Sequence, residues 1–262
     1  MSHASHNAPT EGLGLTRVPR RTPYAPKPSV GPGRARVASS AVPTVEVSSP
    51  TRAYAPRSVG ADWCIRLSRC IAGLAMFGVG IGLILEARLG AAPWDVFHQG
   101  VADKTGMSVG NVIIVTGLVL LVLWIPLRQR PGVGTLLNAL EIGVAVDIVM
   151  PLIPDAGALV VRVVYLVAGL LVIAVGSGLY IGSGLGPGPR DGLMMGLKER
   201  GISVRVARTG IELTVLVLGV LLGGTVGIGT VAFTFGIGPL VQVFLPRFTL
   251  PPRNSVYIPR RS

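Results

Sequence analysis

Charged residues, cysteines and aromatic residues are all scarce in this chain of 262 residues. Only 14% of the residues are charged and 50% are hydrophobic, with a mean hydropathy of +0.62. That balance excludes an ordinary soluble domain and is typical of a polytopic membrane protein. The two cysteines, Cys64 and Cys70, match no zinc or redox spacing, so we expect free thiols. Aromatic residues, at 5%, leave little material for an interfacial belt.

Catalytic and cofactor motifs are also missing from the sequence. His98 has no second histidine beside it to form a metal site, and no nucleophile is spaced to pair with a base. The glycine-rich string 176–188 lacks the Lys-Ser/Thr pair of a phosphate loop and falls in a hydrophobic segment. We therefore expect no enzymatic activity, no catalytic residue, no metal and no cofactor.

The charge that is present is strongly basic, with a formal net charge of +12. We assign it to the cytoplasmic loops and tails of a membrane protein and not to a nucleic-acid-binding surface. Residues 1–60 contain nine prolines and no apolar run, which is typical of disorder. We expect 1–60 and 247–262 to be basic cytoplasmic tails. The first is either a plain solvated tail or a segment that touches anionic lipid.

Six hydrophobic segments are each near the ~20 residues needed to cross a membrane. They are 67–87, 109–127, 134–153, 160–181, 204–222 and 226–245. Two shorter segments, 93–105 and 189–200, open with Pro-x-Asp, which suits the first turn of a helix. At ~1.5 Å per residue these are too short to span, so we predict amphipathic helices that are re-entrant or interfacial.

The chain also repeats itself. Leu89-Gly90-x-x-Pro93-x-Asp95 returns 96 positions later as Leu185-Gly186-x-x-Pro189-x-Asp191, and Gly132-x-Gly134-Thr135 returns 95 positions later as Gly227-x-Gly229-Thr230. The shared order indicates an internal duplication, which we place at 61–154 and 155–246. Three spans per copy invert the second copy relative to the first. The sequence therefore predicts an all-α integral membrane protein with six transmembrane helices in two inverted three-helix repeats.

Basic residues set the predicted orientation. With the N-terminus in the cytoplasm, the outer loops receive only Arg88 and Lys104 as basic residues. We expect a bacterial inner-membrane protein with both termini in the cytoplasm.

A series of motifs resembles the YczE/YitT-type bacterial membrane proteins, nearest to the YczE branch, and the resemblance covers about residues 65–246. The series comprises Leu89-Gly90-x-x-Pro93-Trp94-Asp95, Gly100, Gly106-x-Ser108-x-Gly110 and Gly132-x-Gly134-Thr135. The second copy departs from it, with Arg190 in the place of Trp94 and Arg205 in the place of Gly110. The resemblance implies a multi-pass plasma-membrane protein without an established biochemical activity, and it supplies no binding residues.

Two elbows are the first candidates for a functional role. They are residues 90–93 and 186–189, which begin with Gly90 and Gly186 and end with Pro93 and Pro189. Each is either a simple turn or the lining of a transport site, since irregular backbone at membrane depth must be buried in protein or face a cavity. The acids in the following turns, Asp95 and Asp191, are either capping residues or ligands.

Ionisable residues inside the spans are the second candidates, because a charge at that depth costs a few kcal/mol and needs a partner. Glu141 and Glu212 are candidate proton or cation sites. Asn138 shares a helical face with Glu141, and Arg208 is spaced to pair with Glu212. Asp147 is placed to meet Arg162 near the outer surface. Rows of glycine four residues apart, such as Gly78 and Gly82, predict close packing inside the bundle or a dimer seam.

These features favour a small permease in the lipid bilayer, with a pathway for a small molecule or ion between the repeats. The elbows would frame the pathway and Glu141 would be its main charged group. Two alternatives stay open. One is a non-transporting protein that docks or regulates a membrane partner through the basic tail or the loop 190–205; the other is the membrane substrate-binding subunit of an importer.

Overall fold

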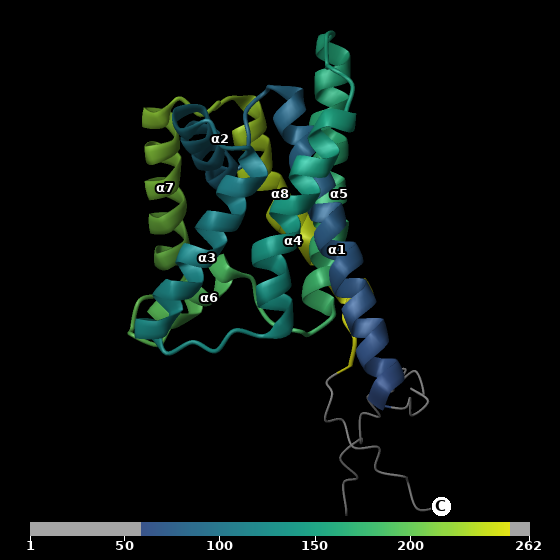
Figure 1. Cartoon of the computed structure of the whole chain (residues 1–262), viewed down its shortest axis with the longest axis vertical. Coiled ribbons are helices and arrows are strands. Elements are labelled where there is room, and N and C mark those ends of the chain that lie inside the picture. Colours follow the sequence, from purple (N-terminus) through teal and green to yellow (C-terminus); the bar gives the residue numbers. More distant parts are fainter. Residues whose placement is uncertain (1–58, 252–262) are drawn as a thin grey trace, which may run out of the picture. The chain divides into compact units, whose positions relative to one another are not determined.

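The computed structural model describes residues 59–251, whose regular elements are all helices (Figure 1). In chain order they are α1 (Val59–Ala87), α2 (Pro93–Thr105), α3 (Val109–Leu127), α4 (Val133–Val149) with a 3-10 turn (Met150–Leu152), α5 (Leu159–Gly182), α6 (Pro189–Lys198), α7 (Val204–Leu222) and α8 (Ile228–Phe248). The predicted all-α class is confirmed for these residues. The predicted tails lie outside them, except that α1 begins at Val59 and α8 continues to Phe248.

Five helices are long and apolar enough to cross a membrane, namely α1, α3, α4 with its 3-10 turn, α5 and α8. Helix α7 is not one of the five, and its first half carries Arg205, Arg208 and Glu212. Large apolar side chains are exposed on the outer faces of α3 and α5, for example Ile125 and Val160. Such surfaces suit contact with lipid and not with water.

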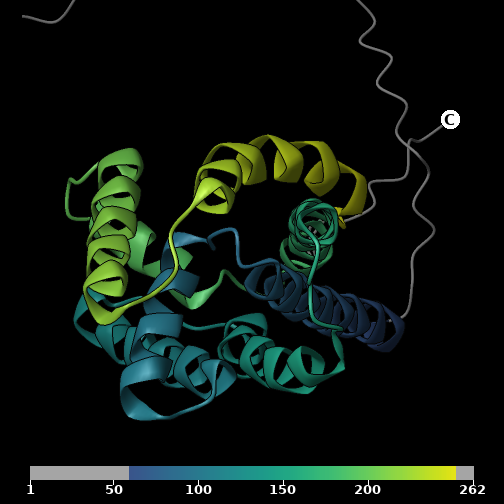
Figure 2. The same ribbon diagram turned by 90° about the horizontal axis from the view of Figure 1, so that it is seen from above.

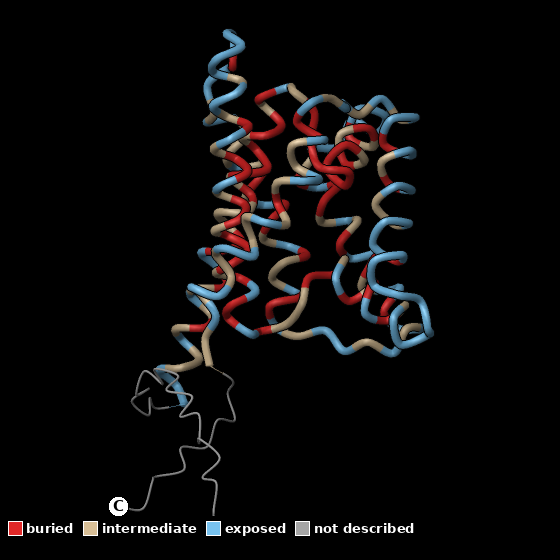
Figure 3. The backbone as a smooth tube through the Cα atoms, turned by 180° about the vertical axis from the view of Figure 1, so that it is seen from behind, coloured by how far each residue is buried: buried red, intermediate tan, exposed pale blue. Residues whose placement is uncertain are grey.

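Helices α1 and α5 pack along each other at one side of the bundle, with α4 packed on α1 and α8 packed on α5 (Figure 2). Helices α1 and α5 pack closely because glycines face each other. A Cβ on Gly73 would lie 2.7 Å from the Gly176 carbonyl oxygen, and one on Gly80 would lie 2.8 Å from that of Gly169. The residue numbers of the contacts fall along α5 as they rise along α1, so the two helices are antiparallel. Buried residues line their facing sides (Figure 3).

The other rows of glycine also pack inside the bundle, as predicted. A Cβ on Gly78 would lie 2.5 Å from the Ala145 Cβ of α4, and one on Gly219 would lie 2.6 Å from the Phe97 backbone nitrogen of α2. Neighbouring helices of the same chain pack on Gly78 and Gly219, so these two glycines serve packing within the bundle.

The remaining helices form a second group. Helix α2 packs on α7, and α6 packs on α3. Helix α3 also packs along α4, whereas α7 does not pack along α8 (Figure 2). The short helices α2 and α6 lie at opposite ends of the bundle (Figure 1). Helix α2 buries Trp94, Asp95 and His98, so it packs within the bundle and does not lie on its surface.

The elbows dock on helix starts from the other half of the chain. The Gly229 N–H at the start of α8 donates to the Leu89 carbonyl oxygen over 2.7 Å, just before the first elbow. The Gly134 N–H at the start of α4 donates to the Leu185 carbonyl oxygen over 3.0 Å, just before the second. Each elbow is therefore held by a Gly-x-Gly-Thr turn that lies far away in the sequence.

A buried arginine joins the two ends of the described chain. Arg66 in α1 donates to the Ser183 carbonyl oxygen over 2.9 Å and to that of Pro251 over 2.6 Å. Its Nε also pairs with Asp62 at 2.7 Å. The start of α1 and the segment after α8 consequently lie at the same end of the bundle.

Candidate functional site

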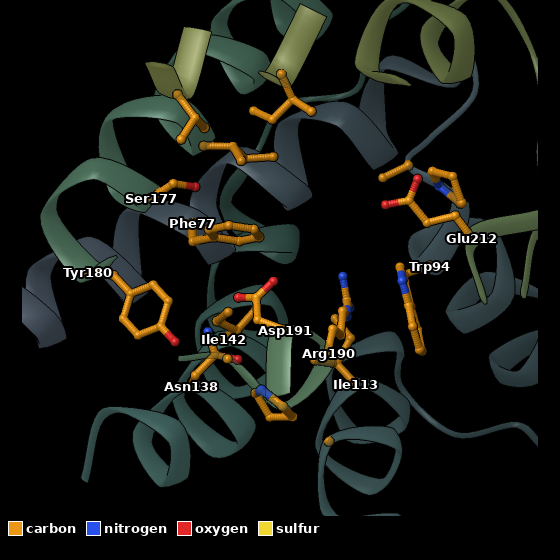
Figure 4. A pocket seen from close by; sticks show the side chains of 18 of the residues that line it. Phe77, Trp94, Ile113, Asn138, Ile142, Ser177, Tyr180, Arg190, Asp191 and Glu212 are labelled. Carbon is orange, nitrogen blue, oxygen red and sulfur yellow. The ribbon is translucent and has the colours of Figure 1, made fainter. Parts of the chain in front are cut away.

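A cavity of about 420 Å³ lies among the helices, and all eight α-helices contribute to its wall (Figure 4). Its volume falls in the range of small-molecule sites. Most of the wall is apolar and includes Phe77, Ile113, Ile142 and Ile173. A few polar and charged side chains gather at the starts of α2 and α6 and on α7. This mixture is typical of a site that orients a small ligand by a few polar contacts.

Both elbows reach this cavity. Pro93 and Pro189 line it, whereas Gly90 and Gly186 form the turns behind them. Each proline is the first residue of its helix, so α2 and α6 present their first turns to the cavity. The backbone N–H groups at a helix start carry partial positive charge. Trp124 of α3 fixes the second elbow, because its Nε1–H donates to the Pro189 carbonyl oxygen over 2.9 Å.

Arg190 stacks on Trp94 inside the cavity. The guanidinium carbon lies 4.6 Å from the centre of the indole ring, and both side chains line the cavity (Figure 4). Within residues 59–251 the guanidinium forms no hydrogen bond or salt bridge. Burial lowers the pKa of Arg190, opposed by the negative charges of Asp95, Asp191 and Glu212, but an arginine remains protonated in proteins. The cavity therefore holds a cation whose N–H groups are free.

A polar cluster surrounds Gly188, the residue before Pro189. A Cβ on Gly188 would lie 3.3 Å from Asp191 Oδ2, 3.4 Å from the Tyr180 hydroxyl oxygen and 3.6 Å from Asn138 Nδ2. The missing side chain thus leaves a small space that three polar groups face. Asp191 is open to the cavity although protein surrounds it, and this burial raises the pKa of its carboxyl group. A hydrogen bond from the Gly188 backbone and the positive charge of Arg190 act in the opposite direction.

Helix α7 contributes an ion pair to the wall. Arg208 Nε lies 2.9 Å from Glu212 Oε1, so the predicted pairing within the helix is confirmed. Both residues line the cavity. Arg208 and Glu212 neutralise each other. Arg190 and Asp191 are therefore the charged groups of the cavity that have no ion-pair partner among the described residues.

Helix α2 adds buried polar atoms without partners. Asp95 Oδ1 lies 3.4 Å from His98 Nδ1, but neither that oxygen nor either ring nitrogen has a hydrogen-bond partner in the described part of the chain. Burial lowers the pKa of His98, opposed by Asp95, so the ring is neutral near pH 7. His98 lines the cavity. No cluster of three or more His, Cys, Asp or Glu within residues 59–251 is arranged to hold a metal ion.

Three predicted residues, Asp95, Glu141 and Asp147, do not line the cavity. Asp147 accepts hydrogen bonds from Ser108 Oγ at 2.6 Å and from a backbone N–H of α3 at 2.8 Å. Its predicted pairing with Arg162 is wrong, because Arg162 Nε donates to the Ala156 carbonyl oxygen over 2.9 Å. Glu141 lies on α4 outside the lining, so its role as the main charged group stays a prediction without a place in the cavity.

Trp94, Tyr180 and Arg190 are site residues that sequence reasoning missed. The predicted repeat carried a signal for two of them, since Trp94 and Arg190 are 96 positions apart and each follows the proline of an elbow. No pattern pointed to Tyr180, which lies within an apolar span.

Comparison with known proteins places the chain in a family. Residues 64–246 match a family of unknown function, DUF6198. The chain belongs to this family. The match to DUF6198 begins in α1 and ends in α8, so it includes the helices that build the cavity.

Relatives support the predicted resemblance. The chain is 38% identical over 197 residues to an uncharacterized protein of Haemophilus influenzae, which covers 75% of this chain and 90% of the relative. It is 35% identical over 187 residues to the uncharacterized membrane protein YczE of Bacillus subtilis, with 70% and 86% covered. It is 26% identical over 179 residues to the uncharacterized protein YyaS of the same species, with 66% and 89% covered. No solved structure matches. The predicted YczE-like family is thus confirmed, and a multi-pass membrane protein is supported.

Proposed function

We propose that the chain is a small permease of the bacterial inner membrane whose substrate site is the cavity at the two elbows. In this proposal, 61–154 and 155–246 are inverted three-span repeats, and both termini are cytoplasmic. One observation carries it: the first turns of α2 and α6, from opposite ends of the bundle, meet in one cavity through Trp94 and Arg190. Interrupted helices that meet at a site between inverted repeats are typical of secondary transporters.

The contacts support the proposed inversion. The contact between Gly73 and Gly176 corresponds, 96 positions along, to the contact between Gly169 and Gly80. The hydrogen bonds that hold the two elbows correspond in the same way: the acceptors Leu89 and Leu185 are 96 positions apart, and the donors Gly134 and Gly229 are 95 positions apart. Such reciprocal contacts are expected where two copies are related by a two-fold axis in the membrane plane. Parallel copies would not make the equivalent helices α1 and α5 antiparallel.

The proposal requires α7 to be a sixth span in spite of its charges. Two of them, Arg208 and Glu212, form an ion pair on the cavity wall, which is how intramembrane charges are usually accommodated. The alternative of partner docking through the loop 190–205 loses one of its residues, because Arg190 faces the cavity.

Cysteine labelling tests the topology. Single cysteines at Lys104, in the last turn of α2, and at Lys198, in the last turn of α6, are compared in a protein whose own Cys64 and Cys70 are replaced by serine. We expect an impermeant maleimide to label K104C in intact cells, and K198C only after permeabilisation. Labelling of both from the same side would overturn the inverted repeat.

Flux measurements test the permease. Purified protein is screened against a metabolite library for solutes that raise its melting temperature, and these solutes are then assayed for uptake into proteoliposomes. Thr234→Trp places a large side chain in the cavity wall and should abolish uptake, whereas Val231→Trp on the exposed side of α8 should not. Uptake that persists in Thr234→Trp would count against a pathway through this cavity.

A further inference from the structure

We infer that the cavity recognises a zwitterion with an apolar body, the chemistry of an α-amino acid that has an apolar side chain. This inference rests on the proposed function and names the substrate class of the same site. It draws on three parts of the wall: a free guanidinium, a polar cluster beside it, and an apolar surface opposite them.

The guanidinium of Arg190 supplies the site for a carboxylate. It is enclosed by protein, points into the cavity and has no hydrogen-bond partner within residues 59–251 (Figure 4). Stacking on Trp94 holds its plane and leaves its N–H edge free. A guanidinium edge matches the two oxygens of a carboxylate. The first turns of α2 and α6 add partial positive charge at the same place.

The cluster at Gly188 supplies the site for an ammonium group, which has three N–H donors and needs three acceptors. Asp191 Oδ2 is the charged acceptor. The Asn138 atom nearest this space is Nδ2, a donor, so Asn138 accepts from an ammonium group only when its amide is turned to present the oxygen. The Tyr180 hydroxyl donates to the Gly186 carbonyl oxygen over 3.2 Å, so its oxygen lone pairs remain free to accept. The space in front of the Gly188 Cα is therefore bordered by one negative charge and two further polar groups.

The charge balance favours a ligand with both charges. Arg190 and Asp191 are consecutive residues in the first turn of α6, where successive side chains point about 100° apart. They form no salt bridge with each other within the described structure. A simple anion would leave Asp191 unpaired in a desolvated site, and a simple amine would leave Arg190 unpaired. A zwitterion pairs both, and the apolar wall of Phe77, Ile113 and Ile142 receives its side chain.

Binding measurements on the purified full-length protein test this inference. The probes are the twenty L-amino acids and, for each that binds, two analogues: one without the amino group and one without the carboxylate. We expect at least one apolar amino acid to bind, and both of its analogues to bind at least tenfold more weakly. Failure of every amino acid to bind overturns the inference.

Three variants separate the two ends of the ligand. Arg190→Gln should weaken amino-acid binding at least tenfold but leave binding of the amine analogue unchanged. Asp191→Asn should also weaken amino-acid binding at least tenfold but leave binding of the carboxylate analogue unchanged. Gly188→Ala keeps both charges, and its backbone φ of −65° suits alanine, but its methyl group narrows the space left for the ammonium group. It should weaken binding of the amino acid and spare the carboxylate analogue. Asp103→Asn and Lys104→Gln, at the exposed end of α2, are matched charge controls.

The outcomes distinguish this inference from the proposed function. If the carboxylate analogue binds as tightly as the amino acid, and Asp191→Asn and Gly188→Ala have no effect, the zwitterion is wrong and the cavity remains a permease site for anions. If binding is unchanged in all three variants and in Thr234→Trp, both proposals fall. Size-exclusion profiles and melting temperatures confirm that each variant is folded before its affinity is used.

Discussion

Replacing Gly90 with alanine measures how much stability comes from docking an elbow on the other half of the chain. Gly90 has a φ of +99°, a conformation that residues with a Cβ rarely adopt. A Cβ there would lie 2.3 Å from the Gly227 backbone nitrogen and 2.8 Å from Thr230 Oγ1. That backbone cannot move aside without disturbing the start of α8, whose Gly229 N–H is bonded to Leu89. The substitution therefore combines backbone strain with a steric clash.

A second glycine separates the two effects. Gly106 ends α2 with a φ of +72°, but a Cβ on it would meet no atom within 4 Å. Gly106→Ala should therefore show strain alone, about 1–2 kcal/mol. A methyl group forced into filled space typically costs a further 1–3 kcal/mol, so we expect about 2–5 kcal/mol for Gly90→Ala. For a domain of this size, that corresponds to a fall in melting temperature on the order of 10 °C.

Thermal unfolding in detergent, followed by tryptophan fluorescence, provides the assay, since the chain contains three tryptophans. Gly90→Ala, Gly106→Ala and the unmodified protein are melted in the same detergent and buffer. Equal melting temperatures for the two variants would refute the reasoning, because the contact with the start of α8 would then add nothing to stability.

Three further predictions concern single polar contacts. Asp147→Asn weakens the 2.6 Å bond to Ser108 Oγ and should cost about 1.5–3 kcal/mol; an unchanged melting temperature would exclude this contact as a tie between α3 and α4. Trp124→Phe removes the 2.9 Å hydrogen bond to Pro189 and should cost about 1 kcal/mol in melting experiments, and also weaken ligand binding; unaltered affinity would show that the elbow needs no support. Because burial raises the pKa of Asp191 and an ammonium ligand needs the ionised carboxylate, amino-acid affinity should rise as the pH increases through that raised pKa. Titration calorimetry should show no such rise in Asp191→Asn, and an affinity that falls with pH would contradict the assignment.

Helix boundaries were predictable where a local signal marks them. Segments 109–127 and 204–222 match α3 and α7, because the N-cap side chains Ser108 and Ser203 accept hydrogen bonds from backbone N–H groups three residues on. The start of α1 was predicted at residue 67 but lies at Val59. Hydropathy does not detect this extra length, which contains the polar pair Asp62 and Arg66, with a Nε–Oδ2 distance of 2.7 Å.

The site was predictable only in part for a similar reason. The pairing of Arg208 with Glu212 is local and follows from their spacing of four residues. Asp147 bonds to Ser108 across 39 positions, and no spacing rule gives that partner. Asn138 and Glu141 are three residues apart on α4, about 60° around the helix, yet only Asn138 lines the cavity. Which side of that angle faces the cavity depends on tertiary packing.

The proposed repeats differ in how their equivalent helices α3 and α7 meet the cavity wall. Along α3, a Cβ on Gly117 would lie 3.2 Å from the Ala139 Cβ, so the glycine permits α3 to pack closely on α4. The residue 95 positions later is Glu212 on α7, which lines the cavity and pairs within its own helix. A glutamate at this position is too large and too polar for the close contact that glycine makes. All three residues line the cavity, so α3 borders it with a close helix–helix contact and α7 borders it with a charged group.

Helices α4 and α8, which face α3 and α7, also differ in how closely a neighbour packs on an equivalent glycine. Gly143 of α4 is covered, since a Cβ there would lie 2.3 Å from the carbonyl oxygen of Gly110 on α3. Its equivalent on α8, 95 positions later, is Gly238, and a Cβ there would meet no atom within 4 Å. The equivalent of Gly110 is Arg205, whose side chain cannot enter a glycine-to-glycine contact. The two proposed repeats are thus alike where α1 and α5 pack and differ along α7 and α8. In the proposed permease, a pathway needs an opening either between α3 and α4 or between α7 and α8, not at both places. Helices α7 and α8 lack the glycine contact, and α7 also carries the ion pair of the cavity wall.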